Sequence, residues 1–437
     1  MTLEEAAAAC VFPSFPGDTP PDWIRRFLSE GGGGLVLFAY NVPSRERLAA
    51  LCASLRAERP DVLLATDEEG GDVTRLEWET GSSYPAGAAL GAVDDPALTE
   101  AVAASIAAEL AAVGVNWNLA PVADVNVPAN PVIGTRAFGS DPELVARHVA
   151  AYVRGIESRG VAACAKHFPG HGSTEQDSHL ELPLLVGDVE DGLPPFRAAI
   201  GAGVHSVMTA HVVVDELPAT IDPAIVGRLL RDELGFDGVV LADALEMKAV
   251  SATVGVEASA VLAISAGVDA LCVGHDLGED AVRSIRSALC ASVDGDRLRE
   301  AASRIARLAA WARPPAAEAD AAVGAEAARR ALLVEGEIGG ARRVVELRPV
   351  ANIAAGEPEH RLDGATVIRE GEPVPEADVF VVRDAHRHAW MRDAADVPGA
   401  VVVETGLPVW RPVQARGYVA TLGGSRVSLE AAAAVIA

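Results

Sequence analysis

Six ionisable side chains stand after short apolar runs within the first 250 residues of the sequence. They are Asp67, Arg136, Lys166, His167, His211 and Asp243. If the apolar runs are strands of one parallel sheet, these groups meet at the carboxyl ends of the strands, where barrel enzymes carry their chemistry. Asp243 follows GVVLA with no turn residue between them. Its carboxylate would therefore be held in a fixed place, as a nucleophile requires.

The segment KHFPGHGSTEQDSH (166–179) is too broken by glycine and proline for a helix and too polar for a core. A functional loop is the better interpretation. Within it, Asp177 and His179 are two residues apart, so the carboxylate can hydrogen-bond the imidazole and favour its protonated form. This arrangement would raise the pKa of His179 above its free value of about 6.5 and suit the ring to donate a proton near neutral pH.

Such a set of groups fits a retaining glycosidase, which needs a nucleophile on one face of a sugar and a proton donor on the other. Asp243 can be the nucleophile and His179 the donor. Lys166 and Arg136 offer several donors for sugar hydroxyls, and Asp67 offers two acceptors. The alternative for these three residues is a structural salt-bridge network.

Two other classes of protein use similar residues. A metal hydrolase would draw its ligands from His167, His171, Asp177, His179, His211 and Asp243. Against that class, the sequence has no His-x-His on the first strand and no His-Glu-x-x-His helix, and Lys166 would place a cation beside the metal. A non-catalytic sugar-binding module is the third class, but binding alone requires neither Asp243 nor the Asp177/His179 pair.

Short apolar runs alternate with longer amphipathic stretches, and this alternation is typical of strand-helix units around a parallel sheet. Eight candidate strands lie at 11–15, 35–39, 62–66, 115–119, 161–165, 205–210, 239–242 and 270–273. Helices are expected between them, as at 43–58, 96–113, 141–159, 223–234 and 256–266. This count predicts an α/β fold with a (β/α)8 TIM-like barrel over residues 1–315. An open doubly wound sheet is less favoured, because no Gly-x-Gly-x-x-Gly turn or phosphate-binding loop follows an early strand.

Beyond Trp311 the sequence turns to proline and alanine, which predicts a linker or helix over 316–335. Five further apolar runs lie at 344–347, 365–368, 378–382, 400–403 and 418–422. They predict a smaller α/β domain over 336–437.

Composition limits the partners and the compartment. A formal charge of -26 opposes nucleic-acid binding, and no apolar run reaches the roughly 20 residues of a membrane span. The first residues carry Glu4 and Glu5 where an export signal would carry a base. Five scattered cysteines favour reduced thiols and hence a cytoplasmic protein. No obligate protein partner is indicated.

Four motifs in order, DEEGG, APVADVNVPANPVIGTRAFG, KHFPGHGSTEQDSH and LADALEM, resemble the β-N-acetylglucosaminidase branch of glycoside hydrolase family 3. The resemblance spans roughly residues 10–310. It implies that Asp243 is the nucleophile of a covalent glycosyl-enzyme and that His179, supported by Asp177, is the acid/base. It further implies a terminal N-acetylglucosamine (GlcNAc) held by Asp67, Arg75, Arg136, Lys166 and His167, with no metal or organic cofactor.

The resemblance also implies a substrate class, a small carbohydrate in which GlcNAc is linked to N-acetylmuramic acid or its anhydro form, as in cell-wall recycling. Some members of the branch resemble phosphorylases. A histidine acid/base would not repel phosphate as a carboxylate would, so that alternative stays open. The C-terminal region is expected to be shorter than the second domain of two-domain members.

Overall fold

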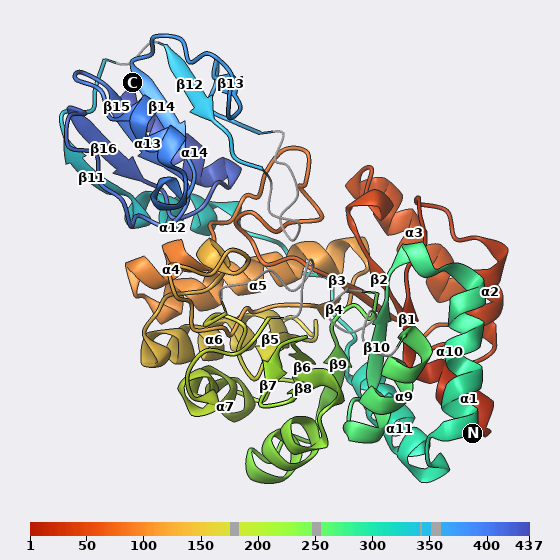
Figure 1. Ribbon diagram of the computed structural model, residues 1–437. Coiled ribbons are helices and arrows are strands. Elements are labelled where there is room, and N and C mark those ends of the chain that lie inside the picture. The colour runs from red at the N-terminus through yellow and green to blue at the C-terminus, as the bar shows by residue number, and fades with distance from the viewer. Residues whose placement is uncertain (175–182, 247–254, 341–342, 351–359) are drawn as a thin grey trace.

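Short strands, most of them wholly buried, alternate with helices over the first 311 residues, as the computed structural model shows (Figure 1). The structure describes residues 1–174, 183–246, 255–340, 343–350 and 360–437. The strands of this part are β1 (Val11–Pro13), β2 (Gly34–Leu37), β3 (Leu63–Thr66), β4 (Trp117–Asn118), β5 (Cys164–Phe168), β6 (Ser206–Thr209), β7 (Val213–Val214), β8 (Leu217–Pro218), β9 (Val239–Ala242) and β10 (Ala270–Val273). Each of the eight predicted strands is present; β7 and β8 add a short antiparallel hairpin.

The eight strands pair in parallel in two sheets, with the orders β1-β10-β9-β6-β5 and β2-β3-β4. A parallel bridge between Trp117 and Ala162 joins β4 to the residues before β5. At the other seam, Phe12 of β1 packs against Gly34 of β2, where a Cβ atom would come 2.5 Å from its ring. No ladder joins β1 to β2 in the described part of the chain. The parallel α/β architecture is therefore confirmed, whereas closure into a barrel stays a prediction.

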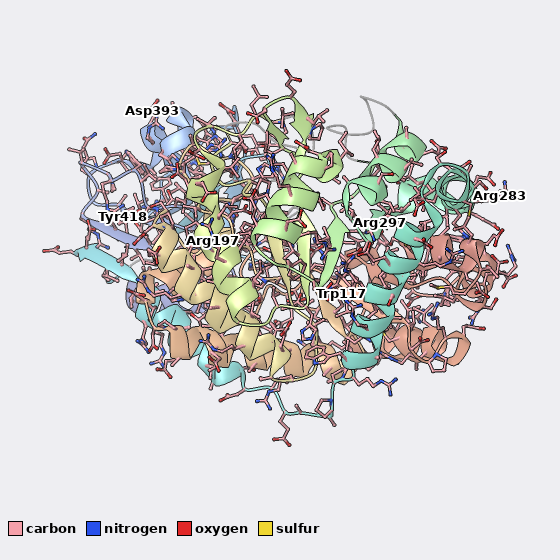
Figure 2. The ribbon with its side chains drawn as sticks, turned by 90° about the horizontal axis from the view of Figure 1, so that it is seen from below. Trp117, Arg197, Arg283, Arg297, Asp393 and Tyr418 are labelled. Atoms are coloured by element: carbon pink, nitrogen blue, oxygen red, sulfur yellow. The ribbon has the colours of Figure 1, made fainter. Side chains whose placement is uncertain are left out.

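Side chains from distant strands meet between the sheets. The rings of Phe12 and Trp117 lie edge to face with centroids 5.4 Å apart, and the indole nitrogen of Trp117 donates to the hydroxyl of Ser206 at 2.7 Å. Figure 2 shows Trp117 among the central strands and Arg283 at the periphery. These contacts of β1, β4 and β6 create one continuous core that fixes the strand ends relative to one another.

Helices surround these strands. They are α1 (Leu3–Ala9), α2 (Asp22–Ser29), α3 (Arg45–Glu58), α4 (Gly87–Val93), α5 (Pro96–Val113), α6 (Pro142–Glu157), α7 (Leu193–Gly201), the π-helical η5 (Ala224–Glu233), α9 (Val256–Ala266), α10 (Gly278–Ser292) and α11 (Gly295–Trp311), with short 3-10 turns η1 (Ala39–Asn41), η2 (Gly134–Arg136), η3 (Val189–Gly192), η4 (Ala219–Ile221) and η6 (His275–Leu277). Local sequence sets their ends. Asp95 caps α5 by accepting from the amide of Leu98, Pro96 occupies its first turn, and Gly114 ends it at φ +87°.

Helix α5 is long and apolar enough, by length and composition, to cross a membrane. Half of it is buried inside the protein, where Leu98, Val102, Ile106 and Leu110 join the core. The core helix of an α/β protein meets the same criterion, and we interpret α5 in that way.

The C-terminal residues build a separate six-stranded sheet, called the second sheet from here on, which is drawn mainly in blue in Figure 1 and lies apart from the eight parallel N-terminal strands. Its strands are β11 (Leu333–Gly336), β12 (Val344–Leu347), β13 (Thr366–Ile368), β14 (Val379–Val382), β15 (Val401–Glu404) and β16 (Gly417–Ala420), in the order β11-β16-β15-β14-β12-β13. The accompanying helices are α12 (Ala321–Ala331), α13 (Ala389–Ala395) and α14 (Arg426–Ile436), with the 3-10 turn η7 (Ala385–Arg387). Alternate residues of the central strands pack against α13 on one face and α14 on the other. The domain limits themselves stay a prediction.

Strand β11 was not predicted, and it begins inside the stretch expected to be a linker or helix. Its four residues are all exposed, and it pairs antiparallel with β16 at the edge of the sheet. An edge strand that buries neither face has no hydrophobic pattern for a sequence argument to detect.

Asp72 joins the second sheet to the first part of the chain. Its two oxygens accept from Arg383 at 2.7 and 2.9 Å, from Thr135 at 3.0 Å and from the amide of Gly424 at 3.0 Å. Burial acts to raise the pKa of Asp72, but Arg383 outweighs it and the pKa is lowered. Asp72 is thus a buried, charged junction between three segments.

We expect Asp72→Asn to destabilise the protein by about 3 kcal/mol near neutral pH, because it leaves the Arg383 guanidinium without its charge partner. Since the pKa of Asp72 lies below its ordinary value of 3.8 in the folded protein, its contribution is present above that value and is lost as the pH falls through the folded pKa. Urea unfolding of both proteins measures this. The stability difference should shrink in acid, and an equal difference at about pH 7 and pH 3 would contradict the assignment.

Candidate functional site

A charged cluster lies at the carboxyl ends of β3 and β5. The ammonium of Lys166, whose side chain is only 2% exposed, donates to Oδ1 of Asp67 at 2.8 Å and lies 2.7 Å from Oε1 of Glu69. Arg75 approaches the other oxygen of Asp67 at 3.5 Å. Three of the predicted binding residues, Asp67, Arg75 and Lys166, are therefore brought together.

Arg136 extends this cluster. Its guanidinium grips Glu69 with two hydrogen bonds, of 2.9 Å from Nε and 2.8 Å from Nη2. Burial acts to raise the pKa values of Asp67 and Glu69, but the neighbouring cations outweigh it and both pKa values are lowered. Burial acts to lower the pKa of Lys166, which its two carboxylate partners raise. The cluster is accordingly charged throughout at neutral pH. It offers a sugar fixed donors and acceptors whose geometry does not have to be organised on binding.

His167 is positioned by Asp124, which is wholly buried. One oxygen of Asp124 lies 2.7 Å from Nδ1 of His167, and the other accepts from the backbone amide of His171 at 2.6 Å. With Nδ1 engaged, Nε2 of His167 is the ring nitrogen available to a ligand. Burial lowers the pKa of His171 to about 4, so its ring is neutral near neutral pH.

The prediction of a loop from residue 166 is wrong at its start, because Lys166, His167 and Phe168 are buried in β5. The loop begins at Pro169 and is held at its root. The side-chain amide of Asn130 donates to the carbonyls of His171 and Thr174 at 2.8 and 3.0 Å. The predicted acid/base His179 and its partner Asp177 belong to this loop but lie outside the described residues. The structure therefore places the first half of the loop, and the roles of Asp177 and His179 stay predictions.

Asp243 follows β9 directly and is half-buried. Its Oδ1 accepts from the amide of Ala244 at 2.8 Å, and His211 holds the carbonyl of Ala244 at 3.0 Å through Nε2. The other ring nitrogen of His211 is 2.9 Å from the hydroxyl of Thr220, so this buried ring supports the backbone beside Asp243. Glu246 accepts from the amide of Gly274 at 3.0 Å, and burial raises its pKa.

Strands β5, β6 and β9 pair in parallel, so Asp243 after β9 and Lys166 near the carboxyl end of β5 lie at the same end of the strands. Burial raises the pKa of the Cys272 thiol in β10, and Glu246, Asp243 and Asp67 raise it further. All five cysteines of the chain are free, as predicted.

Sequence reasoning missed three residues that organise this site, Glu69, Asp124 and Asn130. All three stand in the quoted motifs, Glu69 in DEEGG and the others in APVADVNVPANPVIGTRAFG. Acidic and amide residues in an apolar context were the available signal, because such groups are buried only with a partner. Among described residues, no group of three or more His, Cys, Asp or Glu side chains is arranged to hold a metal ion.

We expect Lys166→Met to cost about 3 to 5 kcal/mol of stability, because Asp67 and Glu69 would face each other without the shared cation. Arg154→Met is the matched control. Its ion pair with Glu100 is exposed, with side chains 48% and 43% accessible, and its loss should cost less than about 1 kcal/mol. Urea unfolding compares the two, and equal losses would mean that the buried cluster is no more important for stability than a surface pair.

Residues 22–308, more than half of the chain, match the family model described as the glycosyl hydrolase family 3 N terminal domain. The chain belongs to glycosyl hydrolase family 3. Curated relatives agree. The sequence is 40% identical over 264 residues to the beta-hexosaminidase of Bordetella avium, covering 57% of this chain and 75% of that protein. It is 38% identical over 275 residues to the beta-hexosaminidase of Methylococcus capsulatus, covering 61% and 82%.

Solved structures extend the likeness. A family 3 beta-N-acetylglucosaminidase from Paenibacillus sp. str. FPU-7 superposes with a TM-score of 0.88 at 29% identity, over 100% of this chain and 96% of that one. NagZ from Neisseria gonorrhoeae, solved with N-trifluoroacetyl-D-glucosamine, superposes with a TM-score of 0.58 at 31% identity, over 69% and 98%. The chain is thus a glycoside hydrolase. Its relatives are named as beta-hexosaminidases or a beta-N-acetylglucosaminidase, which is the branch of family 3 that the sequence motifs predicted. The expectation of a shortened C-terminal region is wrong for the Paenibacillus relative, which this chain matches along almost its full length.

Proposed function

We propose that this family 3 enzyme is a retaining β-N-acetylhexosaminidase that removes non-reducing terminal β-linked GlcNAc through a covalent glycosyl-enzyme. The observation that carries the proposal is the carboxylate of Asp243 at the end of β9, at the same end of the parallel strands as the charged cluster of Asp67, Glu69, Arg136 and Lys166. The choice of GlcNAc as the sugar is supported by the relatives that are named beta-hexosaminidase. We also propose that the eight strands close into a (β/α)8 barrel, which would bring these ends around one mouth.

The proposed mechanism has two steps. Asp243 attacks the anomeric carbon while His179 gives a proton to the departing oxygen, and a covalent ester forms. His179, now neutral, takes a proton from water, which attacks the ester and releases GlcNAc with its β configuration retained. Asp177 would stabilise the protonated form of His179 in the first step.

The binding residues would act on the sugar that stays on the enzyme. Asp67 and Glu69 are held by Lys166 and Arg136, so their remaining lone pairs point in fixed directions and can accept from adjacent hydroxyls. Nε2 of His167 would contact the same ring, because Asp124 occupies Nδ1. We propose a muropeptide fragment as the natural substrate, which the resemblance of the sequence motifs supports. We also propose the cytoplasm as the compartment, which the five free cysteines support.

Product analysis tests the proposal. Purified enzyme is incubated with p-nitrophenyl β-N-acetylglucosaminide and with the β-glucoside, each with and without inorganic phosphate and a chelator. Release of free GlcNAc, unchanged by either addition, supports the hydrolase. Formation of GlcNAc-1-phosphate would assign the enzyme to the phosphorylase alternative. Loss of activity with the chelator would favour a metal hydrolase, and no cleavage of either glycoside would favour a sugar-binding module.

A further inference from the structure

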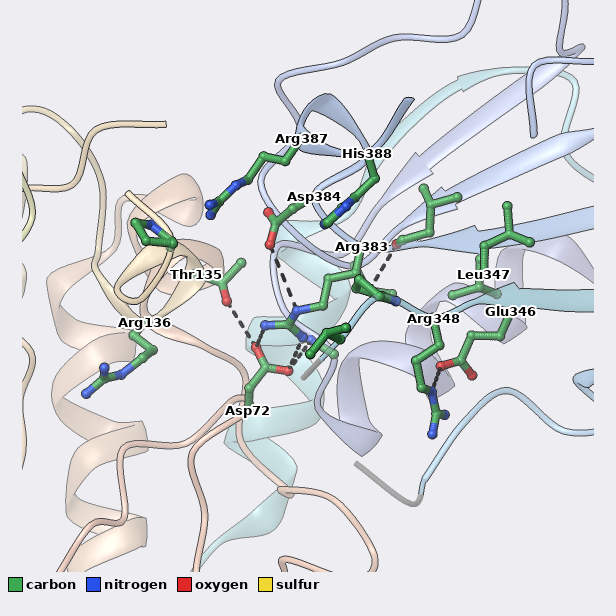
Figure 3. A pocket seen from close by; sticks show the side chains of 18 of the residues that line it. Asp72, Thr135, Arg136, Glu346, Leu347, Arg348, Arg383, Asp384, Arg387 and His388 are labelled. Atoms are coloured by element: carbon green, nitrogen blue, oxygen red, sulfur yellow. Dashed lines mark hydrogen bonds and ion pairs between the residues drawn. The ribbon is translucent and has the colours of Figure 1, made fainter. Parts of the chain in front are cut away.

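A cavity of about 270 Å³ lies between the loop that precedes α6 and the second sheet (Figure 3). Residues 130–136 line it on one side, and the ends of β12 and β14 with η7 line it on the other. It is close to the lower end of the size range of small-molecule sites, large enough for a sugar substituent or a short acidic chain. Of the predicted site residues that the structure describes, Arg136 alone lines it.

Two lining residues connect this cavity to the candidate active site. Arg136 lines the cavity and also grips Glu69, which is a partner of Lys166. Asn130 lines the cavity and holds the root of the His171 loop by its side-chain amide. That loop carries the proposed proton donor, and a proton donor stands beside the oxygen of the leaving group. The cavity therefore adjoins the charged cluster through Arg136 and the root of this loop through Asn130, and in the proposed mechanism it would lie on the leaving-group side.

The charge of the lining is unlike that of the whole chain. The protein carries a formal charge of -26, yet the described residues that line this cavity include four arginines and three carboxylates. Three of the arginines have close acidic partners. Arg383 pairs with Asp72, Arg348 lies 2.7 Å from Glu346, and Arg136 pairs with Glu69.

The fourth arginine differs. The recorded contact of Arg387 is a 3.2 Å hydrogen bond to the backbone carbonyl of Asn130, and no carboxylate in the described part of the chain is paired with it. Figure 3 shows its side chain reaching from the second sheet toward the loop of residues 130–136. The carboxylate beside it, Asp384, already accepts from the amide of Leu407 at 2.8 Å. Arg387 thus brings an exposed guanidinium with free donors to the mouth of the cavity.

We propose that this cavity is a subsite for an anionic group on the leaving-group half of the substrate, with Arg387 as the residue that binds a carboxylate there. The inference rests on the proposed function and extends it to the C-terminal region, which would select acidic leaving groups. A guanidinium binds a carboxylate through two parallel hydrogen bonds, and both are charge-assisted.

The test compares two substrates that differ only in this charge, GlcNAc β-1,4-linked to N-acetylmuramic acid and the methyl ester of the same disaccharide. We expect Arg387→Gln to raise KM for the acid about tenfold and to change KM for the ester less than about twofold. Arg387→Lys should retain part of the preference for the acid. Arg329→Gln, an exposed arginine on α12 away from the cavity, is the control and should change neither.

Equal losses for acid and ester in Arg387→Gln would overturn the subsite, because they would show a purely structural contact with Asn130. If Arg387→Gln instead raises KM for inorganic phosphate, and the product is GlcNAc-1-phosphate, the subsite would also be overturned. The guanidinium of Arg387 would then bind phosphate and not a carboxylate of the substrate. If the wild-type enzyme cleaves neither disaccharide, the proposed function fails. Calorimetry with the uncleaved acid and ester then decides the subsite separately, and equal Kd values would overturn it.

Discussion

Asp243→Asn is expected to lower kcat at least a hundredfold on p-nitrophenyl β-N-acetylglucosaminide while leaving the fold intact, because the amide cannot form the covalent ester. The side chain keeps its volume, and an asparagine Oδ1 can still accept from the amide of Ala244, the bond that positions Asp243. Steady-state kinetics measures the loss, and an unchanged urea midpoint establishes that the variant is folded. Activity above a hundredth of wild type would contradict the assignment.

Two further variants serve as controls for the loss of kcat in Asp243→Asn. Asp237→Asn removes a carboxylate that is 79% exposed and should leave kcat unchanged. Glu246→Gln changes the neighbouring carboxylate, whose bond to the amide of Gly274 the glutamine oxygen can keep. A larger loss of kcat in Glu246→Gln than in Asp243→Asn would move the nucleophile to Glu246.

His179→Ala is expected to lower kcat by about 10² to 10⁴ on a disaccharide and much less on an activated aryl glycoside. A sugar hydroxyl is a poor leaving group that needs a proton, whereas p-nitrophenolate leaves without one. The described root of the loop, held by Asp124 and Asn130, stays intact in this variant. Kinetics on both substrates provides the measurement.

The neutral His171, three residues from the end of β5, is the control for this variant. His171→Gln removes a buried ring that the mechanism does not use, so any loss of activity should be the same on both substrates. Equal losses on both substrates in His179→Ala would show that His179 is structural, and the acid/base would have to be sought elsewhere.

The strands could be predicted from the sequence because each is a short apolar run buried along its whole length, as VVLA is in β9. Helix limits followed from capping residues such as Asp95 with Pro96. The edge strand β11 could not be predicted, because its exposed residues lack a burial pattern. Joining β1 to β2 into a closed barrel depends on packing such as Phe12 on Gly34, which the sequence does not reveal.

The site could be predicted in part for a related reason. Polar residues at or directly after the carboxyl ends of buried strands, Lys166 within β5 and Asp67 and Asp243 after β3 and β9, were identified because parallel strands end on one side. Their partners Glu69 and Asp124 were missed, because a pairing between residues 67 or 43 positions apart depends on the fold and not on spacing. Arg136 was predicted to bind substrate, and the structure shows that its guanidinium already donates to Glu69. Asp67, Arg136 and Lys166 can therefore form a salt-bridge network and also bind substrate.

The C-terminal region makes contacts with the candidate site that no sequence motif indicated. Its Arg383 fixes Asp72, whose neighbour in space Thr135 precedes Arg136, so the second sheet supports the loop of the candidate site. Arg387 lies on the same side. A role for this region in substrate choice follows from these contacts and not from its sequence.

The central claim is a retaining release of GlcNAc, and ¹H NMR of the first product tests it most directly. The enzyme is added to p-nitrophenyl β-N-acetylglucosaminide, and the anomeric proton of the released sugar is followed before mutarotation equilibrates it. If Asp243 forms a glycosyl-enzyme, β-GlcNAc forms first and α-GlcNAc only later. If α-GlcNAc forms first, water attacks the substrate directly, and Asp243 forms no glycosyl-enzyme.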